Sequence, residues 1–137
     1  MIVADTGAVV ALIDVDDRHH RVLREVFVRE PERWILPSMI LPEVDYLLLE
    51  HVGRQAEAIF VEDLAVGNWR VEWGDRAYLT RAHEILQRYP ALDLGLVDAV
   101  VMATAEHLRA DAIATLDLRD FSAVKIDGSP RLIPRDL

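Results

Sequence analysis

Two short apolar runs that each end in an aspartate constrain this chain more than any other feature. Residues 2–4, "IVA", run into Asp5, and residues 112–116, "AIATL", run into Asp117. Short, continuous apolar runs are typical of strands that are buried on both faces of a sheet. Because such strands pair in parallel, both aspartates are expected at the same edge of the sheet, where the sites of α/β proteins form.

Helical patterns separate these strands and predict an α/β fold. We expect helices over residues 6–13, from a cap at Asp17 to about residue 29, and over four further segments, with additional short strands between them. Those further helices are 38–51, a segment after Gly53 ending near 65, one capped by Asp75 and ending near 89, and 96–110; the strands are 34–37, 69–73 and 131–134. Strands alternating with helices favour a short, mostly parallel sheet flanked by helices on both faces. The length of 137 residues favours a single domain over residues 1–137.

Side-chain spacing also predicts what lies inside. The segment 96–110, "LVDAVVMATAEHLRA", is apolar nearly all round and is expected in the middle of the molecule. The tryptophans Trp34, Trp69 and Trp73 flank predicted strands, so we expect them to serve packing. Ile59 is expected to face inward at helical spacing.

Composition narrows the class of protein. The net charge of −9 is unusual for a simple nucleic-acid binder, because phosphate contacts normally require a basic excess. The acidity instead indicates a cation site, a basic protein partner or merely a solvated surface. No apolar run approaches the ~20 residues needed to span a bilayer. With no signal peptide and no cysteine, we expect a cytoplasmic protein that has no membrane partner.

Two further carboxylates are candidates for the same edge of the sheet. Asp98 lies near the start of the most apolar helix, and Glu43 lies early in a helix that follows a short strand. Clustered carboxylates repel one another, at roughly 4 kcal/mol for a pair ~4 Å apart at an effective dielectric of 20, so a cluster must bind protons or cations. Oxygen ligands suit Mg²⁺ or Mn²⁺, which activate water for attack on a phosphodiester. Each acid, taken singly, also fits a helix cap, a turn or a solvated residue.

The tripeptide Asp5-Thr6-Gly7 admits a different interpretation, since it also marks the catalytic aspartate of aspartic proteases. Those proteases of retroviral type are rich in β-structure and glycine-rich turns. This chain has six glycines, is helical over most of its length, and contains no second copy of the tripeptide. The protease interpretation is therefore disfavoured.

Taken in order, four segments resemble the PIN-domain family, and specifically the VapC-type toxins of toxin–antitoxin pairs. The segments are "IVADTGAVVALID", "PSMILPEVDYLL", "LVDAVVMATAEHL" and "IATLDLRDF", which together extend over essentially the whole chain. Each segment alone is a weak signal, whereas the four in series are specific. The resemblance implies a PIN-like three-layer sandwich and a Mg²⁺-dependent endoribonuclease in which Mn²⁺ can substitute. It also implies an RNA substrate, a small antitoxin partner and a homodimer.

By motif position, the resemblance assigns a catalytic quartet of acids to Asp5, Glu43, Asp98 and Asp117. Asp5 and Asp98 take the place of the direct metal ligands. The accessory positions are Asp120, as a further acid, and the hydroxyls of Thr6 and Thr115.

One departure and one alternative accompany this assignment. Family members often carry a serine where this chain has Gly7, so one polar donor near the metal is missing. The alternative function is a non-catalytic PIN-like scaffold that binds RNA or a protein, because an acidic quartet indicates capacity for metal and does not by itself establish turnover.

Overall fold

The computed structural model, which describes all of residues 1–137, contains one sheet of five parallel strands. In spatial order the strands are β3 (Arg70–Glu72), β2 (Trp34–Pro37), β1 (Ile2–Ala4), β4 (Ala112–Ala114) and β5 (Arg131–Ile133). Every neighbouring pair is parallel, and Ala4 of β1 lies opposite Ala114 of β4. The carboxyl ends of all five strands therefore meet at one edge of the sheet.

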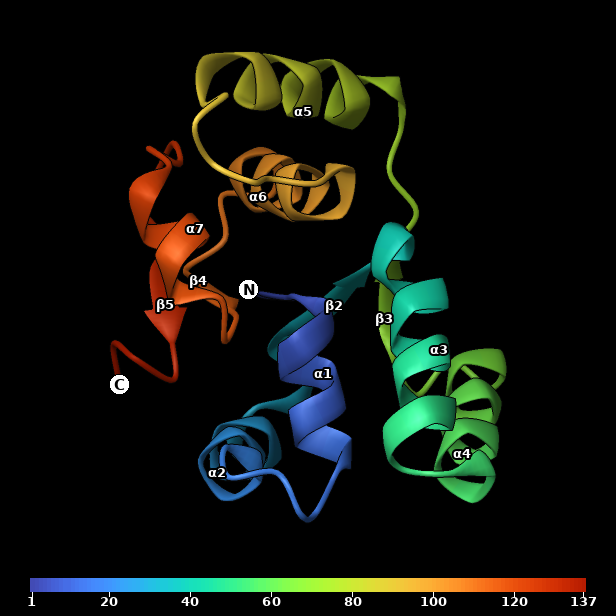
Figure 1. The fold of residues 1–137 in the computed structure, drawn as a ribbon. Helices are drawn as coiled ribbons and strands as arrows, with labels where there is room; N and C mark the ends of the chain where they lie inside the picture. The colour runs from blue at the N-terminus through green and yellow to red at the C-terminus, as the bar shows by residue number, and fades with distance from the viewer.

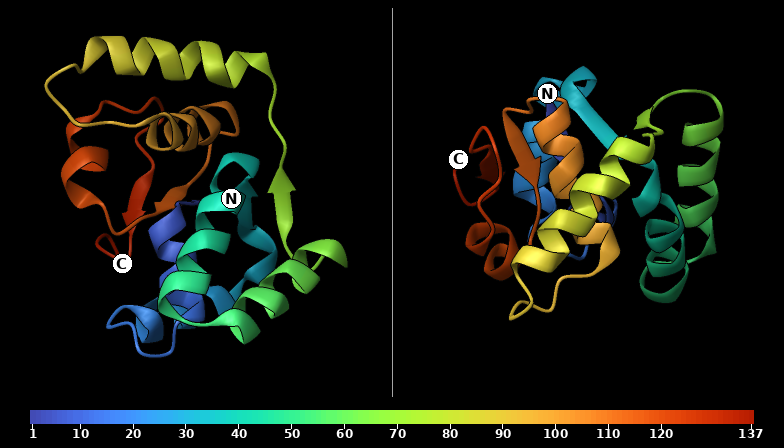
Figure 2. Two further views of the ribbon diagram at one scale, coloured as in Figure 1. Left: turned by 45° about the vertical axis from the view of Figure 1, so that its right-hand side comes forward. Right: turned by 90° about the horizontal axis from the view of Figure 1, so that it is seen from above.

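Seven helices and two short 3₁₀ turns connect and cover the strands. They are α1 (Thr6–Ile13), α2 (His20–Arg29), η1 (Pro31–Arg33), η2 (Ser38–Ile40), α3 (Leu41–His51), α4 (Arg54–Ala65), α5 (Arg76–Arg88), α6 (Leu96–His107) and α7 (Leu118–Ala123). Helices α5 and α6 lie on one side of the sheet, and α1, with α2 and α3 packed beside it, lies on the other (Figures 1 and 2). This arrangement confirms the predicted α/β sandwich.

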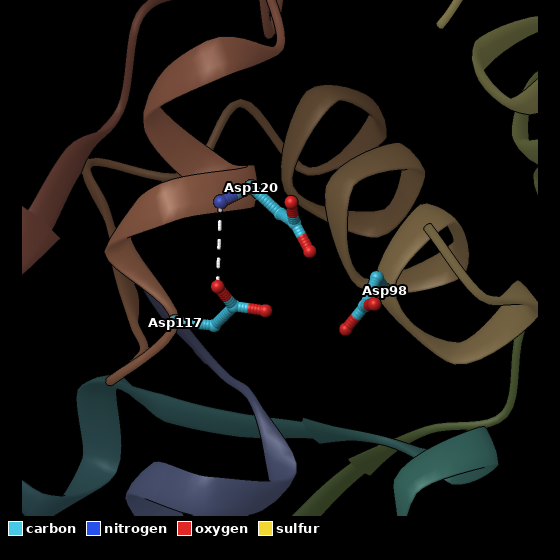
Figure 3. Close-up of side chains that lie close together, drawn as sticks. All are labelled: Asp98, Asp117 and Asp120. Atoms are coloured by element: carbon cyan, nitrogen blue, oxygen red, sulfur yellow. Dashed lines mark hydrogen bonds between the residues drawn. The ribbon is translucent and has the colours of Figure 1, made fainter. Parts of the chain in front are cut away.

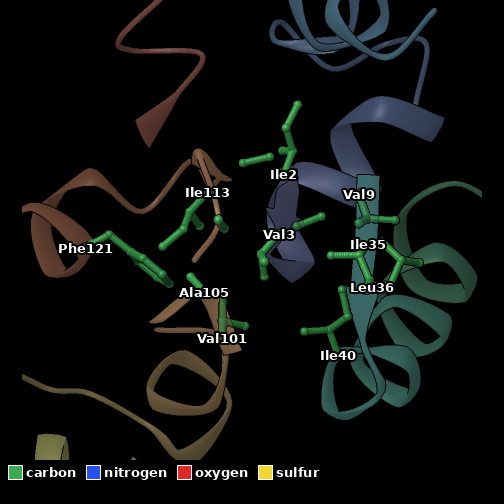
Figure 4. Packing of buried hydrophobic residues seen from close by; sticks show 14 of the residues in the cluster. Ile2, Val3, Val9, Ile35, Leu36, Ile40, Val101, Ala105, Ile113 and Phe121 are labelled. Atoms are coloured by element: carbon green, nitrogen blue, oxygen red, sulfur yellow. The ribbon is translucent and has the colours of Figure 1, made fainter. Parts of the chain in front are cut away.

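The hydrophobic core fills both sides of the central strands. Val3 and Ile113, from β1 and β4, have no exposed surface, and neither does Val101 of α6. Figure 4 shows the side chains of the strands between those of α1 and those of α6. All residues from Ala99 to Ala105 are buried, which confirms the central position expected for this helix. No helix is both long enough and apolar enough to cross a membrane.

Several predicted elements differ from the structure: the helix expected over 38–51 begins at Leu41, after the turn η2, and the helix expected over 96–110 ends at His107. Asp17 does not cap α2: its side chain accepts a hydrogen bond from the backbone N–H of His19 at 2.7 Å, inside the preceding turn, and the helix begins at His20. No helix was predicted after β4, yet the chain there forms α7. This helix has six residues, too few to repeat the spacing by which helices are recognised in a sequence.

The predicted burial of two side chains is wrong. Trp34 is buried, and Trp69 packs on Phe27 at 5.1 Å between ring centroids, but Trp73 is 74% exposed. Trp73 follows the last residue of β3 and precedes Gly74, whose φ of +75° turns the chain away from the sheet. Ile59 is 53% exposed, because α4 reaches the core through Phe60 on its other side.

The different burial of two isoleucines, Ile113 and Ile59, leads to a first prediction. Ile113→Ala removes a fully buried side chain at the centre of the sheet and is expected to lower the free energy of unfolding by about 2–5 kcal/mol. Ile59→Ala makes the same chemical change at a half-exposed position and should cost less than about 1 kcal/mol. Urea denaturation of both variants measures the difference. Equal losses would contradict the assignment of Ile113 to the core.

Candidate active site

Asp5 lies at the carboxyl end of β1, at the point where the chain enters α1. Its backbone N–H donates to the carbonyl of Ala114 at 2.8 Å, which extends the pairing of β1 with β4 by one residue. Its Oδ1 accepts from the N–H of Thr6 at 2.8 Å, and its Oδ2 accepts from the Oγ1 hydroxyl of Thr115 at 3.0 Å. The side chain is only 6% exposed, so this carboxylate is both buried and held at each oxygen.

Asp117 and Asp120 come from the short helix that follows β4. Asp117 is the N-cap of α7, and its Oδ1 accepts from the backbone N–H of Asp120 at 3.3 Å. The hydroxyl of Thr115 accepts from the N–H of Asp117 at 3.1 Å, so Thr115 links this turn to Asp5. One helical turn after Asp117, α7 brings Asp120 to the same side of the structure (Figure 3).

Asp98 approaches the same space from α6. It is the third residue of that helix, and its Oδ2 accepts from the N–H of Gly95 at 3.4 Å. One carboxylate oxygen from each of Asp98, Asp117 and Asp120 lies within 4.8 Å of the others. Figure 3 shows the three carboxylates pointing into one space between α6 and α7. We call these three residues the aspartate triad.

Glu43 and Asp5 stand at the border of this cluster. Glu43 is an exposed residue of the first turn of α3, and its charge acts on Asp98. The charges of Asp98 and Asp117 act in turn on Asp5 and raise its pKa. The acids named from the sequence therefore gather around one edge of the sheet, with the aspartate triad as the group whose oxygens approach most closely.

Burial and mutual repulsion raise the pKa of several of these carboxyls. Loss of solvation raises the pKa of Asp5 from 3.8 to about 6, against the lowering effect of its hydrogen bonds to Thr6 and Thr115. Burial, followed by the charges of Asp117, Asp120 and Glu43, also raises the pKa of Asp98, although the hydrogen bond from Gly95 opposes this. The pKa of Asp120 is raised by burial and by Asp117. The site thus concentrates negative charge that lacks a positive partner.

The donor set fits a hard cation. Asp120 is 9% exposed, and its Oδ1 is buried without a hydrogen-bond partner, as is the hydroxyl of Thr6. A buried oxygen that accepts no hydrogen bond is costly unless a cation or a proton satisfies it. All candidate ligands are oxygens, which is the ligand type that Mg²⁺ and Mn²⁺ prefer.

The structure also shows what the sequence reasoning missed. Asp93, in the loop before α6, adds to the charges that raise the pKa of Asp120, and no motif distinguished it. A Cβ atom at Gly7 would meet no atom within 4 Å, so the structure leaves room for the serine that family members often carry there. The capping interpretation was also correct in part, because Asp5, Asp98 and Asp117 each accept a backbone N–H at the start of a helix.

A parallel sheet with acids gathered at its carboxyl edge defines a class of α/β protein, and comparison with known proteins identifies it. The family model of the PIN domain matches residues 2–127, so the chain belongs to the PIN-domain family. It is 30% identical over 129 residues to ribonuclease VapC26 of Mycobacterium tuberculosis, an alignment that covers 94% of this chain and 96% of the relative.

Solved structures share the fold. The structure of VapC20 of Mycobacterium tuberculosis, described as a toxin that cleaves the sarcin–ricin loop, superposes with a TM-score of 0.80 at 23% identity over 95% of this chain and 99% of that one. A toxin–antitoxin complex from Klebsiella pneumoniae gives a TM-score of 0.68 at 20% identity over 97% and 96% of the two chains.

The raised pKa of Asp5 predicts how stability changes with pH. Because the folded-state pKa of about 6 exceeds the ordinary value of 3.8, the protonated carboxyl stabilises the fold fully below about pH 4. That contribution, at most about 3 kcal/mol, is lost as the pH rises through 6. Asp5→Asn should therefore stabilise the metal-free protein by about 1–3 kcal/mol near pH 7.5 and have little effect near pH 4.

The measurement is urea denaturation with a chelator present at the two pH values. Asp75→Asn is the matched control, since Asp75 caps α5 by accepting from the N–H of Ala77 outside the acidic site, and asparagine caps equally well. If Asp5→Asn destabilised the protein at both pH values, the burial of an uncompensated charge at Asp5 would be contradicted.

Proposed function

We propose that this chain is a metal-dependent endoribonuclease of the VapC type, the toxin component of a toxin–antitoxin pair. The observation that carries the proposal is the aspartate triad, with the buried and unpartnered Oδ1 of Asp120, at the carboxyl edge of the sheet. The relative named ribonuclease VapC26 supports the same reaction. We also propose that residues 1–137 act as one domain.

The proposed ligands of the metal are Asp98, Asp117 and Asp120, with Asp5 behind them. Asp5 stays in the set because each of its oxygens accepts only one hydrogen bond and so retains a lone pair. We propose Mg²⁺ as the ion, with Mn²⁺ as a substitute, because carboxylate oxygens alone select hard cations.

A bound ion of this kind supplies a lowered pKa for the attacking water and stabilises charge on the phosphodiester. The chain's own residues provide the geometry. The N–H of Thr6 and the hydroxyl of Thr115 fix both oxygens of Asp5, and the N–H of Asp120 fixes Oδ1 of Asp117. Glu43 is exposed, and we assign it the role of accepting the proton of the attacking water at its carboxylate.

RNA cleavage tests this proposal. Purified protein is expected to cut RNA from a mixed cellular pool in Mg²⁺ or Mn²⁺ and to be inactive with a chelator. Asp98→Asn, Asp117→Asn and Asp120→Asn should each lower the cleavage rate by at least about 100-fold, because each removes a ligand charge. Glu50→Gln removes an exposed carboxylate of α3 that takes no part in the cluster and should leave cleavage unchanged.

Metal binding is measured separately from turnover. A saturating ion that binds only the folded state raises its stability by about 2.7 kcal/mol at 100 times the dissociation constant, so the thermal midpoint should rise with Mg²⁺ or Mn²⁺ in the wild type and not in Asp98→Asn. Cleavage that survives all three substitutions would contradict the site. Absence of both cleavage and stabilisation would favour the non-catalytic scaffold.

An antitoxin partner is part of the proposal. The Klebsiella structure is a toxin–antitoxin complex, and the net charge of −9 favours a basic partner. A partner arginine would satisfy the carboxylates of the aspartate triad in place of metal. We further propose that the protein acts in the cytoplasm, where its RNA substrate is found.

We also propose that the protein is a homodimer that uses the exposed apolar surface around Trp73. Trp73 and Leu79 are 74% and 48% exposed, and they border a hollow of about 230 Å³ together with Met39 and Tyr78. Large exposed apolar side chains that cluster in this way mark interaction surfaces.

Sedimentation velocity tests the dimer. The wild type is expected to sediment as a dimer, and Trp73→Ser combined with Leu79→Ser should give a folded monomer. The matched change at another exposed apolar residue, Val66→Ser, should leave the dimer intact. A dimer that persists in the double variant would exclude this surface.

A further inference from the structure

The largest cavity of the molecule lies at the edge of the sheet opposite the acids. Its volume is about 700 Å³. Arg33 precedes β2, Asp111 precedes β4 and Arg131 opens β5, so the cavity lies at the amino ends of the parallel strands. The end of α6 closes it with Glu106, and Arg109 follows directly after that helix.

Two of the three acidic side chains of this cavity form ion pairs. Asp111 contacts the N-terminal amine and accepts from Nη2 of Arg33 at 2.9 Å. Glu106 accepts from Nε of Arg81 at 3.0 Å. Asp127, the third acid of the lining, forms no ion pair, although its charge acts on Arg81.

Two arginines of the cavity have no such partner. Arg109 and Arg131 line it, both are exposed, and no carboxylate lies within 4.0 Å of either guanidinium. Asp136 is the acid on which the charge of Arg131 acts, but its two oxygens are engaged by Arg135 and by the N–H of Leu132. Other arginines of the chain also form no ion pair, but these two share one hollow.

The backbone conformation at Arg109 is also unusual for an arginine. Its φ is +49°, a left-handed conformation that glycine or asparagine usually adopts after a helix. Arginine occurs there against the backbone preference, and its charge stands beyond the carboxyl end of α6, where the helix dipole favours a cation. The position thus directs a guanidinium to the cavity at some conformational cost.

We propose that this cavity binds a phosphate group of the RNA substrate through Arg109 and Arg131, as a second contact remote from the site of cleavage. The proposal rests on the proposed ribonuclease function. The planar guanidinium fork matches the oxygens of a phosphate. Helix α6 joins the two sites, because Asp98 is its third residue and Glu106, near its other end, lines the cavity; from Asp98 to Arg109 the chain rises about 17 Å at 1.5 Å per residue. Because α6 is buried, the RNA would pass over the surface between the two sites, and at about 3.4 Å per stacked nucleotide this path requires at least about five nucleotides of one strand.

The experiment compares the salt dependence of RNA binding in three proteins. All carry Asp98→Asn so that the RNA is not cut, and the probe is a labelled single-stranded RNA of random sequence. The first protein has no other change, the second carries Arg109→Gln and Arg131→Gln, and the third carries Arg24→Gln and Arg54→Gln. These control arginines are equally exposed, form no ion pair and lie outside the cavity.

We expect the cavity variant to bind RNA about tenfold more weakly at low salt. Its slope of log affinity against log salt should shrink by roughly 0.7–1.4, which corresponds to one or two lost phosphate contacts. The control variant should retain the parent's affinity and slope. Thermal midpoints verify folding, and Arg131→Gln alone, a change at an exposed strand end, replaces the double variant if Arg109→Gln does not fold.

The outcomes separate this inference from the proposed function. Equal binding by the cavity and control variants, in a protein whose wild type cuts RNA, would overturn the phosphate site and assign the cavity to ion pairing or to a protein contact. Wild-type protein that neither binds nor cuts RNA would overturn the ribonuclease proposal itself.

Discussion

The parallel pairing of β1 with β4 is the constraint on which the candidate active site depends. Ala4 lies opposite Ala114, and the next residue, Asp5, still donates its backbone N–H to Ala114. This register places the hydroxyl of Thr115 against Oδ2 of Asp5, and two residues later Asp117 caps α7. A slip of one residue would turn every side chain of a strand to the opposite face, so the same apolar contacts that bury the strands also set the positions of the acids.

The carboxylates of the site cap helices and also leave negative charge available for a cation. Asp5, Asp98 and Asp117 each accept a backbone N–H at a helix start, where the positive end of the helix dipole favours a carboxylate. This attraction offsets only part of the cost, since the pKa values of Asp5 and Asp98 are still raised by burial and repulsion. The helix caps therefore hold the carboxylates in place, and the uncompensated charge that remains favours a cation or a basic partner.

Much of the fold could be predicted because apolar runs reflect burial directly. The strands at 2–4 and 34–37 and the helix at 6–13 follow from such runs, and the apolar helix predicted over 96–110 lies at the centre as α6. Two strand-end aspartates on parallel strands also suffice to expect them at one edge. The exposure of Trp73 could not be predicted, because it depends on a turn that leads the chain away from the sheet.

The close approach of side chains from distant segments could not be predicted from the sequence either, because it too depends on the three-dimensional path of the chain. Asp120 followed from motif position only as an accessory acid, yet α7 brings it within 4.8 Å of Asp98 and Asp117. The cavity at the amino edge assembles residues from η1, α6 and β5, and no local pattern marks such a set. The charge of each residue is visible in the sequence, whereas its neighbours are decided by tertiary packing.

The hydrogen bond between Thr115 and Asp5 spans 110 residues of a chain of 137. During synthesis β1 can pair with β2 early, but its other neighbour, β4, and the helix α7 that follows are made much later. The acids of the proposed ribonuclease site therefore come together only after β4 and α7 have been synthesised, and a nascent chain that stops before Asp117 lacks two members of the aspartate triad.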